Sequence, residues 1–162
     1  MKINLKNKID KLDDKTKEFI HNNRFHLLSE FFDGITSLGS PVIIILVIGI
    51  LWSIGESLPA KTLLLGLLIS GTIVRAIKRL TNRKRLEKHL NVVFSEKSFP
   101  SGHTTSAFMT AVILNHFYNR PTAFFSLATT VAISRVHLED HYLSDVLPEA
   151  ITGILVSTAI LM

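Results

Sequence analysis

Two histidines and a carboxylate in the second half of the chain have the types and spacing for phosphoryl transfer chemistry. His103 follows a Pro-Ser-Gly turn, and His141 lies four residues before Asp145. Residues four apart share one face of a helix, so this carboxylate can orient the His141 ring and raise its basicity. Two histidines can divide the roles of nucleophile and general acid. The residues alone do not choose the nucleophile, although only His141 has a carboxylate one helical turn away.

Cationic and small polar residues accompany these histidines. Lys78 and Arg85 are seven apart, about two turns along one side of a helix, and Arg135 lies just before the second histidine. Ser101 and Gly102 form a turn whose amides point at the start of the next helix, and such groups cradle a phosphate. Phosphoryl transfer needs mainly positioning and positive charge on the non-bridging oxygens, which the three cations can supply without a metal.

The elements that must position these residues are apolar helices. The chain is 47% hydrophobic, with a mean hydropathy of +0.34, and its apolar residues gather in blocks between charged segments, as in membrane proteins. Five spans are predicted, at about 41–58, 61–80, 103–118, 121–136 and 143–162. The predicted fold class is all-α, a multi-pass transmembrane helical bundle with about five spans. A soluble all-α domain is the alternative, but a domain of this size cannot bury so many apolar helices.

An amphipathic N-terminal segment, residues 1–35, precedes the bundle of residues 41–162, and we expect residues 1–162 to form a single domain. Apolar residues recur in this segment at roughly helical spacing among charged ones: Leu5, Ile9, Leu12, Phe19, Leu28 and Phe32. The pattern indicates one or two helices that lie on the membrane surface, or a solvated extension that packs on the spans. The first apolar run begins too late for a cleavable signal peptide.

Alternation of the spans places the chemistry-bearing residues on one membrane face. The end of the second span, the start of the third and the connection between the fourth and fifth all lie there. Nearly all Lys and Arg residues also fall on or near that face, and only Lys61 and Arg120 lie opposite. The positive-inside rule therefore predicts a cytoplasmic site.

Three motifs in this order resemble the type 2 phosphatidic acid phosphatase family, which belongs with the lipid phosphate phosphatases and vanadium haloperoxidases. The first reads K-RLTNRK-R-L at 78–86, with Leu86 where the family usually has Pro. The second, Pro-Ser-Gly-His, is complete at 100–103, and the third, SR-VHLED-H-YLS-D, is complete at 134–145. Leu86 changes how the chain leaves the first motif, but it removes no charged group.

The resemblance implies a metal-independent, multi-pass cell-membrane phosphatase that needs no cofactor and forms a phosphohistidine. Its substrate would be a phospholipid or polyprenyl phosphate in the bilayer: phosphatidic acid, phosphatidylglycerol phosphate or a polyprenyl diphosphate. His141 would attack phosphorus, Asp145 would orient it, and His103 would protonate the leaving oxygen. The phosphate would be held by Lys78, Arg85, Ser101, Gly102 and Arg135. Most bacterial members of the family face outward, which opposes the charge bias and leaves both sides open.

Other functions fit parts of the same pattern. A lipid phosphotransferase would use the same site, a haloperoxidase would hold vanadate there, and an anion transporter would only bind. His137, His141 and Asp145 have the spacing of zinc ligands, but their cationic surroundings disfavour a metal. Nucleic acid is disfavoured because the basic residues lie beside apolar spans. The absence of cysteine excludes disulfides, and the sequence specifies no oligomeric state.

Overall fold

The computed structural model describes residues 5–23, 25–80 and 102–162. Within these ranges the chain forms seven α-helices and one short 3-10 turn, without a strand, which confirms the predicted all-α class. The elements are α1 (Leu5–Asn22), α2 (His26–Thr36), η1 (Ser37–Gly39), α3 (Pro41–Ser53), α4 (Ser57–Leu80), α5 (Gly102–Tyr118), α6 (Pro121–His137) and α7 (Leu143–Leu161).

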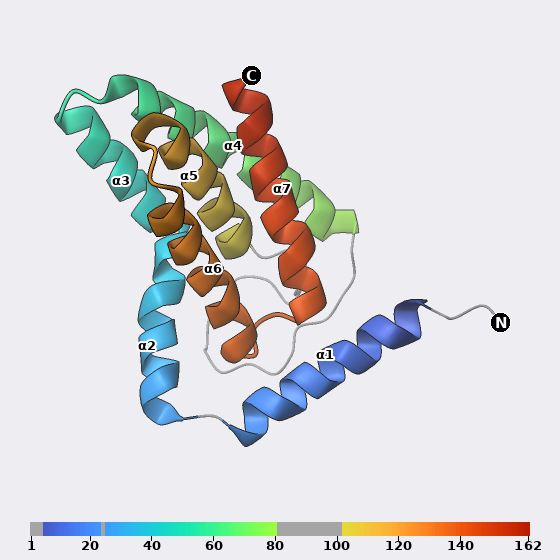
Figure 1. The fold of residues 1–162 in the computed structure, drawn as a ribbon. Helices are drawn as coiled ribbons and strands as arrows, with labels where there is room; N and C mark the ends of the chain where they lie inside the picture. The colour runs from blue at the N-terminus through green and yellow to red at the C-terminus, as the bar shows by residue number, and fades with distance from the viewer. Residues whose placement is uncertain (1–4, 24, 81–101) are drawn as a thin grey trace.

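Helices α3 to α7 form a bundle, with α5 packed against α4, α6 and α7. Figure 1 shows the start of α5, the end of α6 and the start of α7 together at the lower end of this bundle. Helices α1 and α2 lie at that same end, and they pack against α7 and α6 respectively. The predicted N-terminal segment is therefore two helices that contact the bundle beside the ends of its helices.

The five predicted spans correspond to α3 to α7, but their lengths differ. Helix α4 over Ser57–Ile77 and α7 over Leu143–Leu161 are long and apolar enough to cross a membrane. The pair His26–Gly39 and Pro41–Ser53 meets the same criterion only together, and it is bent by 57°. Helices α5 and α6 have 17 residues each, short of the roughly 20 that a bilayer core requires. Among the described residues, two helices pass this test, or three if the bent pair is one span.

Proline and serine fix where α3 begins. Pro41 occupies the first turn, where its missing N–H costs no helical hydrogen bond, and the Ser40 side chain accepts a hydrogen bond from the Ile43 N–H at 3.3 Å. The helix ends earlier than predicted, at Ser53, because the chain turns through Gly55 at φ +88°.

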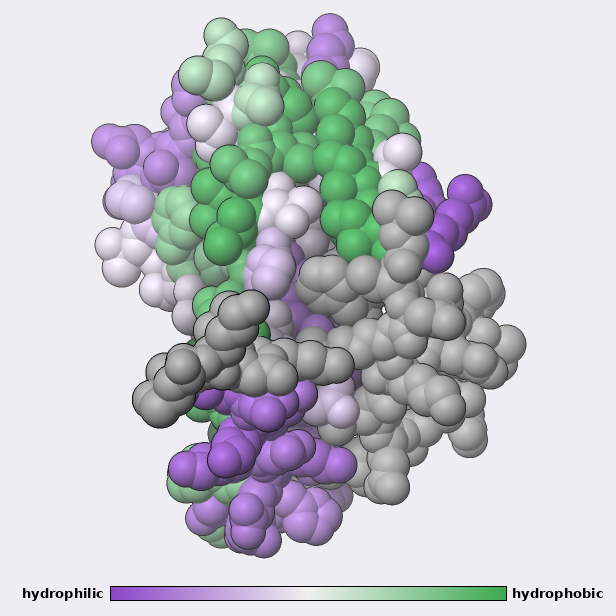
Figure 2. Space-filling model, turned by 90° about the vertical axis from the view of Figure 1, so that its right-hand side faces the viewer, coloured by the Kyte–Doolittle hydropathy of each residue, from purple (hydrophilic) through white to green (hydrophobic). Residues whose placement is uncertain are grey.

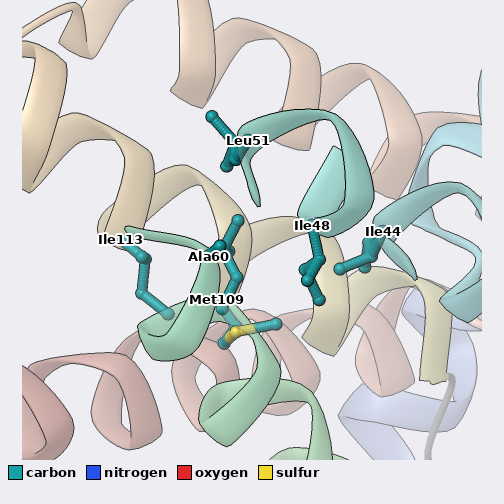
Figure 3. Packing of buried hydrophobic residues seen from close by; sticks show 7 residues of the cluster. Ile44, Ile48, Leu51, Ala60, Met109 and Ile113 are labelled. Atoms are coloured by element: carbon teal, nitrogen blue, oxygen red, sulfur yellow. The ribbon is translucent and has the colours of Figure 1, made fainter. Parts of the chain in front are cut away.

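A cluster of aliphatic side chains joins α3, α4 and α5 in the upper part of the bundle (Figure 3). This aliphatic cluster comprises Ile44, Ile48, Leu51, Ala60, Leu63, Met109 and Ile113, all buried. Its members make only non-directional contacts, so it holds the three helices together by close packing.

Large apolar side chains also cover the outside of the bundle. They include Val42, Ile45, Leu46 and Ile50 on α3, Leu64, Leu65 and Leu68 on α4, and Leu147, Ile151 and Leu155 on α7. In Figure 2 hydrophobic residues (green) cover the middle of the upper part of this face, with hydrophilic ones at its edges, while hydrophilic residues (purple) gather at the lower end, where α1 lies. So extensive an exposed apolar surface is typical of a protein surrounded by lipid.

Candidate active site

The connection between α6 and α7 folds back on itself and brings Arg135 beside His141. The backbone N–H groups of Asp140 and His141 both donate to the Arg135 carbonyl, each at 3.2 Å. Glu139 adopts φ +57° within this turn, a left-handed conformation that lets the chain reverse within a few residues. Two residues of the third motif, six positions apart, are therefore neighbours through the backbone.

Arg135 is only 5% exposed, and two side chains hold its guanidinium in place. Its Nη1 donates to the hydroxyl of Thr36 at 3.1 Å and forms an ion pair with Asp140 at 2.8 Å. Thr36 comes from the end of α2, so the N-terminal segment helps to orient this cation. A preoriented arginine is suited to bind a phosphate, because little side-chain freedom is lost on binding.

His141 and Asp145 are both buried, at 2% and 0% exposure. The assumption of one helix through both residues was wrong, because α7 begins at Leu143 and His141 lies in the turn before it. Asp145 instead closes a capping turn: its carboxylate accepts from the Tyr142 N–H at 3.3 Å, and its own N–H donates to the Tyr142 carbonyl at 3.0 Å. This turn ties the carboxylate to the residue that directly follows His141.

Gly102 and His103 are the first two residues of α5, at the end of the bundle where the α6–α7 connection lies. The first amides of a helix have no partner within it, so this start is suited to an anion. Gly39 of η1 packs directly on His103: a Cβ built on Gly39 would lie 2.6 Å from the His103 carbonyl oxygen. Close approach of η1 to the start of α5 therefore requires glycine at position 39.

The remaining predicted residues have less structural description. The backbone of Lys78 belongs to the last turns of α4, but its side chain lies outside the described residues, as do Arg85 and Ser101. His137, a ligand of the alternative zinc site, contacts α2 instead: its ring lies 4.7 Å from that of Phe32, and its Nε2 is 3.4 Å from the Ser29 hydroxyl.

Three residues that contact this site from distant parts of the chain were not predicted from the sequence. Thr36 and Gly39 come from the N-terminal third of the chain, and Asp13 of α1 accepts hydrogen bonds from Ser144. None belongs to the three motifs. No local sequence signal marks them, because each is defined only by a contact with a segment that lies 64 to 131 residues away along the chain.

Residues 59–162 match the PAP2 superfamily, which is more than half of the sequence, so the chain belongs to this superfamily. The family resemblance carried by the three motifs is thereby confirmed. Among curated proteins, no sequence matches significantly.

Two solved structures share the fold. LpxE from Aquifex aeolicus is 26% identical with a TM-score of 0.79, over 91% of this chain and 93% of that one. A transmembrane PAP2 type phosphatidylglycerolphosphate phosphatase from Bacillus subtilis is 25% identical with a TM-score of 0.81, over 95% of this chain and 85% of that one. Together with the apolar surface, these likenesses support a multi-pass membrane phosphatase.

Proposed function

We propose that this protein is an integral membrane phosphatase that hydrolyses the phosphate ester or diphosphate of a lipid through a phosphohistidine on His141. The observation that carries the proposal is the pairing of a buried, preoriented arginine with a buried histidine at one end of a lipid-exposed bundle. Unaided hydrolysis of phosphate monoesters is so slow that positioning and charge must supply most of the acceleration.

The reaction would proceed in two displacements at phosphorus. An imidazole nitrogen of His141 attacks, the bond from phosphorus to the lipid oxygen breaks, and His103 gives its proton to that oxygen. Water then attacks the phosphohistidine, the phosphorus–nitrogen bond breaks, and the proton of the water passes to His103. Inorganic phosphate leaves, and both histidines return to their initial states.

The other predicted residues have supporting roles in this reaction. Asp145 orients the segment that carries His141, while Arg135 and the amides at Gly102 balance the charge on the non-bridging oxygens. We extend the binding role to Lys78, Arg85 and Ser101 from their places in the motifs. Because these cations can neutralise the phosphate, we expect activity to persist after a strong chelator removes divalent metals.

Similar proteins guide the choice of substrate. The Bacillus subtilis relative is a phosphatidylglycerolphosphate phosphatase, and that lipid, phosphatidic acid and polyprenyl diphosphates are our candidate substrates. All three place a phosphate at the bilayer surface, where the polar end of this bundle would meet it.

The test is phosphate release by the purified protein in detergent with each candidate lipid. His141→Ala should abolish release, whereas His116→Ala should not, because His116 is an exposed residue near the opposite end of α5. Folding of both variants is checked by thermal unfolding. Full activity of a folded His141→Ala variant would overturn the mechanism, and transfer of phosphate to a lipid alcohol without release would indicate a phosphotransferase.

A further inference from the structure

Helix α1 lies against the segment that carries the proposed nucleophile. Asp13, Thr16, Lys17 and Ile20 are three, four and seven residues apart, so they share one face of α1. With residues of the 136–143 segment, His141 among them, this face lines a small hollow. The N-terminal helix therefore forms part of the surroundings of His141, although no site motif reaches into it.

One residue of α1 accepts two hydrogen bonds across this contact. Asp13 is 3% exposed, whereas its neighbours Asp10 and Asp14 are exposed. Its Oδ1 accepts from the Ser144 backbone N–H at 3.1 Å, and its Oδ2 accepts from the Ser144 hydroxyl at 2.5 Å. Both carboxylate oxygens are thus used by a residue 131 positions further along the chain.

Ser144 is the second residue of α7, where a backbone N–H has no partner within the helix. A carboxylate at this position satisfies that donor and is favoured by the positive end of the helix dipole. Asp13 therefore acts as a capping group for α7 that a different helix supplies.

The position of Ser144 in the chain connects this capping contact with His141. Ser144 directly precedes Asp145, whose carboxylate holds the Tyr142 N–H, and Tyr142 directly follows His141. The two hydrogen-bonded carboxylates, one from α1 and one from α7, thus fix the four residues 142–145 that directly follow His141.

We infer that Asp13 is a positioning residue for the reaction: through Ser144 it holds the turn that carries His141 and Asp145. This inference rests on the proposed function, because its first test measures the rate of lipid phosphate hydrolysis. Because Asp13 acts through its contact with Ser144, its loss lowers the rate of the chemical step and leaves substrate binding nearly unchanged. Misplacement of a reacting group by about 1 Å costs roughly a hundredfold in rate.

The experiment compares Asp13→Ala with Asp14→Asn and Asp13→Asn in the full-length protein. Asp13→Ala should lower kcat by roughly 10- to 100-fold at nearly constant KM. Asp13→Asn keeps one acceptor oxygen and should restore part of the rate, while Asp14→Asn, an exposed control one residue away, should match wild type. A change confined to KM, an unchanged rate, or a higher rate on loss of Asp13 would overturn the inference, the last because α1 would then obstruct the site.

A double variant tests whether Asp13 affects the rate through Ser144 or through a general disturbance of the fold. Asp13→Ala combined with Ser144→Ala should be no slower than Asp13→Ala alone, since Asp13→Ala already removes the hydrogen bond that the Ser144 hydroxyl donates. Losses that multiply would contradict action through Ser144.

A second readout does not depend on activity. Hydrogen exchange of the amides in 138–147 should accelerate in Asp13→Ala and not in Asp14→Asn. If exchange accelerates in Asp13→Ala but the wild-type protein hydrolyses no lipid phosphate, the proposed function is wrong and the positioning contact between Asp13 and Ser144 is still supported. Unchanged exchange would refute the tie itself.

Discussion

The two ends of the bundle are held together by different physics. The aliphatic cluster of α3, α4 and α5 consists of apolar side chains that contact one another without hydrogen bonds. The opposite end buries Ser134, Arg135, His141 and Asp145, and there directional contacts fix individual atoms. Packing of the first kind tolerates repacking, whereas hydrogen-bonded networks lose function when one partner moves.

This difference predicts which residues mainly determine stability and which mainly determine activity. Changes in the aliphatic cluster should lower the free energy of unfolding and leave the chemistry of folded molecules intact. Changes around Arg135 and His141 should lower activity more than stability. Four variants test this division.

The largest effect is expected for Ile113→Ala in the aliphatic cluster. Ile113 is fully buried, so the truncation should lower the free energy of unfolding by about 3 kcal/mol through the cavity it leaves. Unfolding in detergent measures the loss, and activity per folded molecule should stay at the wild-type value. Leu155→Ala, at an exposed position of α7, is the control and should cost far less. A reduced kcat in folded Ile113→Ala would show that the two ends are not independent.

At the polar end, Gly39→Ala should reduce activity by about a hundredfold. The new Cβ would meet the His103 carbonyl oxygen at 2.6 Å and Val131 Cγ1 at 2.9 Å, so η1 and the start of α5 must move apart. Gly49→Ala provides the matched control, because a Cβ there meets nothing within 4 Å. Steady-state rates of both variants, taken with their unfolding temperatures, make the comparison. Equal activity of the two would refute a requirement for glycine at position 39.

A smaller effect is expected when Arg135 loses its contact with α2. Thr36→Val removes the hydroxyl that accepts from Nη1, a hydrogen bond of about 1 kcal/mol, so kcat/KM should fall about fivefold. Thr129→Val, on the exposed side of α6, should leave kcat/KM unchanged. If both variants behave like wild type, Asp140 alone suffices to orient Arg135.

The smallest effect has the opposite sign. Glu139 occupies a left-handed conformation, and its buried Oε1 makes no hydrogen bond, although it lies 3.6 Å from His21. Glu139→Gly should therefore raise the free energy of unfolding by about 1 kcal/mol. Asn119→Gly, at φ 49° on an exposed turn, should gain less, because asparagine tolerates this conformation. A loss of stability in Glu139→Gly would mean that the contact with His21 outweighs the strain.

The helices could be predicted from the sequence because their signals are local. Blocks of apolar residues end at charges, and Pro41 and Pro121 stand in the first turns of α3 and α6. Span number was less predictable, since α5 and α6 combine an apolar composition with only 17 residues.

Motif spacing predicts the candidate catalytic and phosphate-binding residues, whose roles stay predictions, but it does not predict the residues that support them. Asp13 is one of several acidic residues in α1, and nothing in the sequence distinguishes it from exposed Asp14. Thr36 and Gly39 gain their roles only from contacts with α6 and α5. The left-handed conformation of Glu139 also contradicts residue preference, and it occurs where two backbone N–H groups close the turn on the Arg135 carbonyl.

The bend between α2 and α3 joins an apolar helix to the contact that orients Arg135. Helix α3 has 13 residues, about 20 Å, which is shorter than a hydrocarbon core of about 30 Å. A helix shorter than the core is accommodated by thinning of the bilayer around it, so a thicker bilayer places more strain on the bend of 57° through which α3 joins α2 and Thr36. In vesicles whose acyl chains are lengthened stepwise, we expect phosphate release by wild type to change more than release by Thr36→Val. Membrane thickness would then regulate how firmly the enzyme holds its anion.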